Sequence, residues 1–181
     1  MTAIKHPGQR VGIFIDTQNL YHSAKNIYKR RVNFGQIVKD GLAGRTLVRA
    51  LAYMVRTESG EEQSFIEALE KAGIETKTKD LQIFYGGAKK ADWDVGIAVD
   101  AITLSSRLDA VIIVSGDGDF IPLVEYLQFN KGCQVEVIAF GKSASAKLIE
   151  AADDYINLDD NSRRYLMPGS NYRERPNTRE A

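Results

Sequence analysis

Short apolar runs alternate along this chain with segments whose apolar residues recur at helical spacing. The runs Val11–Ile15 and Ala110–Val114 contain no polar side chain, as is typical of strands buried on both faces of a sheet. In contrast, Glu61–Ala72 places apolar side chains three and four residues apart, which favours an amphipathic helix. The expected strands are 11–15, 46–55, 75–85, 110–114, 133–140 and 155–158. The expected helices are 19–29, 34–42, 61–72, 94–106, 121–130 and 143–152.

Strands that alternate with helices indicate βαβ units and a mostly parallel sheet. Right-handed crossovers then place helices on both faces of that sheet. We therefore predict an α/β fold, a three-layer Rossmann-like domain with a mostly parallel central sheet. Ligands of such domains bind outside the carboxyl ends of the strands, where the strand order reverses. The residues that directly follow the apolar runs are thus the candidates for chemistry.

Composition and charge narrow the function classes. The 181 residues fit one domain, and 24 basic residues balance 24 acidic ones, so a uniformly basic nucleic-acid coat protein or a polybasic membrane binder is not expected. One cysteine and two histidines exclude an internal disulfide and a zinc site built from these residues. No run approaches 18 apolar residues, so we expect no membrane span and a cytoplasmic location.

From residue 161 onward the chain changes character. Residues 161–181 hold five arginines, two glutamates and two prolines, with almost no apolar periodicity. Their formal charge is +3, which leaves −3 on residues 1–160. We expect a folded domain over 1–160 and a flexible arginine-rich tail over 161–181.

Acidic residues follow two of the apolar runs. Asp16 directly follows the run Val11–Ile15. Asp117 and Asp119 lie in SGDGDF, which directly follows the run Ala110–Val114. If the two strands are neighbours, these carboxylates converge at one edge of the sheet. Two carboxylates about 4 Å apart repel by about 4 kcal/mol at an effective dielectric constant near 20, so such a cluster calls for a cation. Oxygen ligands suit Mg²⁺ or Mn²⁺, metals that bind phosphate and activate water.

A third acidic segment lies between these runs. Asp94 begins an expected helix, whereas Asp100, six residues later, lies about 120° away around the helix axis. We therefore take Asp94 as the metal ligand and expect Asp100 at the edge of the site, acting through the ligands. Each aspartate also has a simpler interpretation, because aspartate after a strand is a common helix cap and a helical aspartate is often merely solvated.

Three segments together resemble a known family. FIDTQNLY, KKADWDVGIAVDAI and SGDGDFIPLVEYLQ, in this order and spacing, are similar to the LabA-like branch of the NYN domains, which belong to the PIN-like nuclease superfamily. The resemblance runs from about residue 10 to residue 158. It implies a PIN-like sheet with an acidic Mg²⁺- or Mn²⁺-dependent site, and metal-assisted hydrolysis of RNA phosphodiester bonds.

The resemblance also assigns residue roles. Asp16, Asp94, Asp117 and Asp119 are the implied catalytic metal ligands, Asn19 orients Asp16 or a bound water, and Ser115 is the small polar residue before the aspartate pair. The role of Asp100, which also matches a family aspartate, is less defined. The resemblance allows two copies of the chain to pair as a homodimer.

The phosphate charge of RNA requires cations around this acidic centre. We expect Lys89 and Lys90, just before the helix motif, and Lys142, in a later loop, to contact the substrate, which would be single-stranded RNA. Solvated loop lysines are the alternative. The alternative functions are a catalytically silent regulatory or RNA-binding module, and a small-molecule phosphohydrolase. The haloacid-type phosphohydrolase motif would need an aspartate at Gln18.

Overall fold

The computed structural model describes residues 2–56, 62–83, 85–87 and 89–169. For residues 83, 89 and 90 it describes the backbone only.

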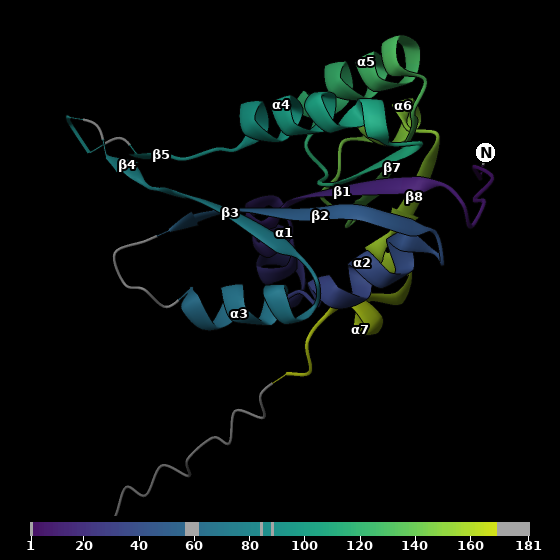
Figure 1. Ribbon diagram of the computed structural model, residues 1–181. Helices are drawn as coiled ribbons and strands as arrows, with labels where there is room; N and C mark the ends of the chain where they lie inside the picture. The colour runs from purple at the N-terminus through teal and green to yellow at the C-terminus, as the bar shows by residue number, and fades with distance from the viewer. Residues whose placement is uncertain (1, 57–61, 84, 88, 170–181) are drawn as a thin grey trace, which may run out of the picture.

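A six-stranded, wholly parallel sheet forms the centre of the fold (Figure 1). Its strand order is β3-β2-β1-β6-β7-β8. The bounds are β1 Arg10–Asp16, β2 Thr46–Arg56, β3 Glu75–Asp80, β6 Ala110–Val114, β7 Gln134–Ala139 and β8 Asp154–Asn157. The chain builds outward from β1 on one side and from β6 on the other, so the order reverses between these two neighbours. The predicted three-layer α/β fold is confirmed.

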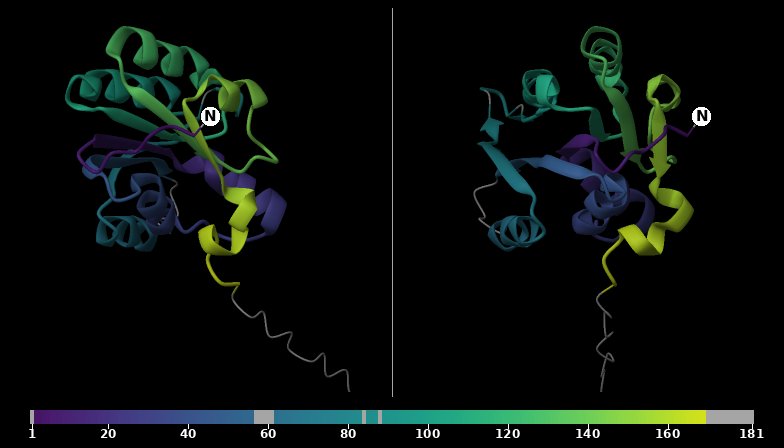
Figure 2. Two further views of the ribbon diagram at one scale, coloured as in Figure 1. Left: turned by 90° about the vertical axis from the view of Figure 1, so that its right-hand side faces the viewer. Right: turned by 45° about the vertical axis from the view of Figure 1, so that its right-hand side comes forward.

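Helices cover both faces of the sheet, as Figure 2 shows. One layer contains α1 Thr17–Tyr28, α2 Phe34–Leu42, α3 Gln63–Lys71 and α7 Ser162–Tyr165. The other contains α4 Asp94–Leu104, α5 Ile121–Lys131 and α6 Ala146–Ala151. Short 3-10 turns are η1 Ser105–Arg107, η2 Gly118–Phe120 and η3 Leu158–Asn161.

Burial explains why the apolar runs became the central strands. All five residues of β6 are buried, and alternate side chains enter the two separate cores on opposite faces of the sheet. Ile112 packs in the core beneath α1 and α2, whereas Ile113 packs beneath α4 and α5. A strand covered on both faces has no position for a polar side chain, so its sequence is continuously apolar.

Two regions differ from the expected element boundaries. The strand expected over 75–85 leaves the main sheet after Asp80, and β4 Gln82–Ile83 pairs instead with β5 Lys89–Lys90 in a separate antiparallel ribbon. The folded part also continues past residue 160. Helix α7 follows, and Tyr165 and Leu166 are buried in the core. Residues 170–181 of the expected tail lie outside the described residues.

None of the helices in the described part of the chain has the length and apolar character to cross a membrane.

Candidate metal centre

Asp16 stands at the carboxyl end of β1, where the chain turns into α1. Its side chain caps that helix: Oδ1 accepts a hydrogen bond from the Asn19 backbone N–H at 3.1 Å. Oδ2 accepts one from the Ser115 hydroxyl at 3.2 Å. Burial raises the pKa of Asp16, and the nearby charge of Asp117 adds to this, while these hydrogen bonds work in the opposite direction. The cap expected as the simple interpretation is therefore present, and it holds the carboxylate at the sheet edge.

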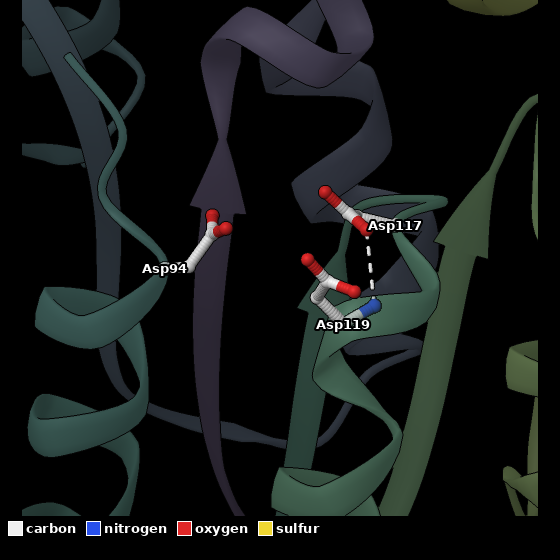
Figure 3. A group of neighbouring side chains, drawn as sticks. All are labelled: Asp94, Asp117 and Asp119. Carbon is white, nitrogen blue, oxygen red and sulfur yellow. Dashed lines mark hydrogen bonds between the residues drawn. The ribbon is translucent and has the colours of Figure 1, made fainter. Parts of the chain in front are cut away.

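Asp117 and Asp119 lie in the turn that follows the neighbouring strand, β6. The Asp117 carboxylate caps η2 and accepts a hydrogen bond from the Asp119 backbone N–H at 3.0 Å (Figure 3). The Ser115 hydroxyl, which donates to Asp16, also accepts from the Asp117 backbone N–H at 3.2 Å. Ser115 is fully buried, so it joins the ends of β1 and β6 at a fixed point.

Asp94 approaches this edge from the other side. It is the first residue of α4, and it faces the Asp117–Asp119 turn across the end of β1 (Figure 3). Asp94, Asp117 and Asp119 each offer a carboxylate oxygen, and these oxygens all lie within 4.8 Å of one another. We call these three residues the acidic triad.

The electrostatics of the acidic triad reflect this crowding. The pKa of Asp94 is raised to about 6, first by burial and then by the charges of Asp16, Asp117, Asp92 and Asp119. Three converging carboxylates repel one another in the absence of a cation. Their oxygen-only donor set suits a hard divalent ion such as Mg²⁺ or Mn²⁺, so the residues present fit a metal of this class.

Asp16 lies beside the triad rather than within it. Its charge raises the pKa of Asp94, yet both of its oxygens already accept hydrogen bonds from Asn19 and Ser115. The structure thus brings together three of the four ligands expected from the sequence and places the fourth next to them.

Asn19 connects the two loops of the site. Its side-chain oxygen accepts a hydrogen bond from the Gly116 backbone N–H at 2.9 Å. Gly116 itself has no room for a side chain, because a Cβ would lie 2.9 Å from Ala144 Cα. Asn19 therefore fixes the position of the turn that carries Asp117 and Asp119.

Asp100 points elsewhere. Its Oδ2 accepts hydrogen bonds from the Tyr53 hydroxyl and the Lys77 ammonium, both at 2.7 Å. Tyr53 comes from β2 and Lys77 from β3, so Asp100 ties α4 to that half of the sheet. The rotation of about 120° between positions 94 and 100 explains why the two carboxylates separate.

The expected substrate lysines lie in two different places. Lys142 follows β7, where its backbone N–H donates to Asp159 at 2.8 Å and its Nζ lies 5.1 Å from the centre of the Tyr28 ring. Lys89 and Lys90 form β5, ahead of α4, and their side chains lie outside the described residues.

One anchor of the site was not predicted from the sequence. The indole N–H of Trp93 donates to the Met54 carbonyl at 2.8 Å and so ties the start of α4, next to Asp94, to β2. A Cβ on Gly96 would lie 2.6 Å from the Trp93 ring. The glycine three residues after the tryptophan, inside a helix, is the one sequence signal of this contact.

Comparison with known proteins places this geometry in a family. The NYN domain family matches residues 10–159 of the sequence. The chain belongs to the NYN domain family. This confirms the resemblance, because NYN domains are part of the PIN-like nuclease superfamily and the matched range contains the whole acidic triad.

Two relatives resemble this NYN domain over most of its length. The Low amplitude and bright protein LabA of Synechococcus elongatus is 28% identical over 165 residues, which is 83% of this chain and 84% of LabA. A protein of unknown function from Vibrio parahaemolyticus has a crystal structure with a TM-score of 0.81 and 31% identity. The match covers 91% of this chain and 100% of that one.

Proposed function

We propose that this NYN domain is a ribonuclease that hydrolyses phosphodiester bonds in single-stranded RNA with Mg²⁺ or Mn²⁺. The acidic triad is the observation that carries the proposal, since three carboxylates within 4.8 Å meet at the point where the strand order reverses. Asp94, Asp117 and Asp119 would hold the metal, with Asp16 as the adjacent carboxylate. The bound ion would supply an activated water and neutralise charge on the phosphate oxygens.

The chain's own residues would act by fixing carboxylates before the substrate arrives. Ser115 and Asn19 hold the ends of β1 and β6 in register through hydrogen bonds of 2.9–3.2 Å. The Trp93 indole holds the start of α4 in place on β2. Preorganised carboxylates need no rearrangement when the substrate binds, which favours the reacting geometry over others.

The phosphate charge of the substrate would be met by Lys142 and by the β5 lysines, Lys89 and Lys90. Lys142 supports this role best, because its loop packs against the metal centre: the Ser145 backbone N–H donates to the Gly116 carbonyl at 2.9 Å. An RNA strand entering along this loop would pass the Lys142 ammonium on its way to the acidic triad.

A cleavage assay tests the proposed activity. End-labelled single-stranded RNA is incubated with the full chain in Mn²⁺, in Mg²⁺ or in EDTA, alongside Asp117→Asn and Asp109→Asn variants. Asp109 precedes β6 and so lies at the opposite end of the strand that leads to Asp117, where it pairs with Arg10. We expect cleavage by the wild type and by Asp109→Asn with metal, and none by Asp117→Asn.

Equal cleavage by all three proteins would identify a contaminating nuclease and refute the assignment. Binding of RNA without cleavage at any divalent concentration would refute the ribonuclease and favour a silent RNA-binding module. Release of inorganic phosphate from nucleotides or sugar phosphates, with RNA intact, would favour a phosphohydrolase instead.

A further inference from the structure

Helix α1 lies along the carboxyl edge of the sheet and leads away from the metal centre. It begins at the end of β1, where Asp16 caps it. Farther along, Ser23 accepts a hydrogen bond at 2.8 Å from Ser143, which follows β7. At its end, the Tyr28 hydroxyl donates to Asp159, which follows β8. With 12 residues at about 1.5 Å each, α1 provides a surface about 18 Å long that starts at the acidic edge.

The charge of the segment that comprises α1, the following loop and the start of α2 is one-sided. Residues 17–39 contain five basic residues and no acidic one. Aspartate and glutamate make up 24 of the 181 residues, so an average stretch of 23 residues in this chain would hold about three. The segment that follows Asp16 is therefore positive from Lys25 onward, although the protein as a whole is neutral.

The cations at the end of α1 and just after it are also left without carboxylate partners, unlike several arginines of the fold. In the described residues, five arginines form ion pairs with aspartate or glutamate: Arg10, Arg45, Arg49, Arg56 and Arg164. In the part of the chain that the structure describes, no carboxylate lies within ion-pair distance of the exposed side chains of Lys25, Lys29 and Arg30. These three cations remain available to an external anion.

An exposed aromatic ring accompanies them. Tyr21 is 47% exposed on the solvent side of α1, and the Lys25 ammonium lies 5.6 Å from the centre of its ring. Proteins that bind single-stranded nucleic acid combine a positively charged track for the phosphates with aromatic rings on which bases stack. Tyr21 and Lys25 provide one of each, about one and a half and two and a half helical turns from the Asp16 cap.

We propose that the α1 basic face, defined as Tyr21 and Lys25 of α1 together with Lys29 and Arg30 just after it, binds the RNA strand beside the scissile phosphodiester. The three cations contact phosphates and the Tyr21 ring stacks on a base. The inference rests on the proposed function, because the acidic triad at the start of α1 is what would cut the bound strand. It specifies the side of the metal centre on which the substrate extends.

Other exposed cations of the fold provide matched controls. Tyr126 and Lys131 on α5 form a similar pair, with Nζ 5.8 Å from the ring centre, but Lys131 ends α5 just before β7 begins. Lys71 and Arg107 are also exposed and lie four and three residues before strands β3 and β6. These cations therefore lie toward the amino edge of the sheet, opposite the acidic triad.

Fluorescence anisotropy with a labelled 12-nucleotide RNA tests the inference separately from cleavage. All proteins carry Asp117→Asn and are measured in EDTA, so the strand stays intact. The test protein adds Lys25→Gln, Lys29→Gln and Arg30→Gln; the control adds Lys71→Gln, Arg107→Gln and Lys131→Gln. The salt slope is the steepness with which the logarithm of the binding constant falls with the logarithm of the salt concentration. On a single strand, each lost phosphate contact lowers it by about 0.7, so three lost contacts lower it by about 2. The same loss weakens binding on the order of a hundredfold at 0.1 M salt. The control triple should bind like its parent.

The aromatic part of the proposal has its own pair of variants. Tyr21→Ala should weaken binding about tenfold through lost stacking, with little change in salt slope, whereas Tyr126→Ala should have no effect. Both side chains are exposed, so neither change should disturb the fold.

Unchanged binding by the Lys25, Lys29 and Arg30 triple, or equal losses in the test and control triples, would overturn the proposal. A second refuting outcome combines two results: a polyglutamate peptide competes as strongly as RNA, and Tyr21→Ala has no effect. The α1 basic face would then fit an acidic protein. Wild type that binds RNA through α1 but fails to cut it in the cleavage assay would refute the ribonuclease and still support the α1 basic face.

Discussion

The crowding of carboxylates around Asp94 makes a prediction about stability. The folded chain raises the pKa of Asp94 from about 3.8 to about 6, so the folded state favours the neutral carboxyl. This favourable contribution is fully present below pH 3.8 and is lost as the pH rises through 6. At pH 7.5 without metal, the charged carboxylate therefore destabilises the fold.

The magnitude follows from the size of the pKa change. A rise from 3.8 to about 6 corresponds to about 3 kcal/mol before screening. Asp94 is partly exposed, and water screens most of this, which leaves about 1 kcal/mol. The dipole of α4 favours a negative charge at its first residue and so offsets about 0.5 kcal/mol of this remaining destabilisation. Asp94→Asn should thus raise the unfolding midpoint of the metal-free protein by about 1–3 °C at pH 7.5, by roughly half as much at pH 5, and should change it little at pH 3.5.

A divalent ion should make the wild type more stable than Asp94→Asn, the reverse of the order expected without metal. A ligand at a hundred times its dissociation constant stabilises the folded state by about 2.7 kcal/mol, which the wild type should gain in Mn²⁺ and Asp94→Asn should largely lose. Thermal unfolding of both proteins is followed by circular dichroism, without metal at pH 3.5, 5 and 7.5 and with Mn²⁺ at pH 7.5.

The reasoning is refuted if metal-free Asp94→Asn is less stable than wild type at pH 7.5. Asp94 would then serve mainly as the start of α4, and its repulsion by neighbouring carboxylates would be too weak to matter. Equal stabilisation of both proteins by Mn²⁺ would show that Asp94 does not contact the ion.

Three further predictions concern other contacts. Glu136→Gln breaks the buried, two-pronged pair with Arg45 and should cost about 3–5 kcal/mol in the free energy of unfolding by urea, because it leaves a buried charge without its partner. Trp93→Phe removes the hydrogen bond that anchors α4 to β2 and should weaken Mn²⁺ binding by calorimetry several-fold, with the secondary structure seen by circular dichroism unchanged. The Arg10 guanidinium lowers the pKa of Asp109 to about 2, so this pair stabilises the fold above pH 4 and the benefit is lost as the pH falls through 2. Asp109→Asn should therefore lower the unfolding midpoint at pH 7 and have a much smaller effect at pH 2, where the carboxyl is half protonated in the folded state.

The sheet was predictable because burial on both faces leaves a direct trace in the sequence. Every residue of β6 is buried, so no polar residue interrupts Ala110–Val114. The β4–β5 ribbon left no such trace, because each strand has two residues and pairs outside the main sheet. A two-residue strand has no periodicity for a pattern to reveal.

The candidate site was predictable in part for a related reason. Parallel neighbours end at the same edge, so residues after β1 and β6 had to approach one another. The partners of Asp100 could not be predicted in this way. Tyr53 and Lys77 come from β2 and β3, and only the three-dimensional packing of α4 over these strands brings them to one carboxylate. Helical rotation predicted that Asp100 would diverge from Asp94, but not where it would point.

A crystal of the full chain soaked in Mn²⁺ tests the central claim most directly. Anomalous scattering locates manganese independently of any assumption about the site. The account predicts one strong anomalous peak, or two adjacent ones, among the carboxylates of Asp94, Asp117 and Asp119 at the ends of β1 and β6. No peak there at millimolar Mn²⁺, with the three carboxylates in place, would contradict it.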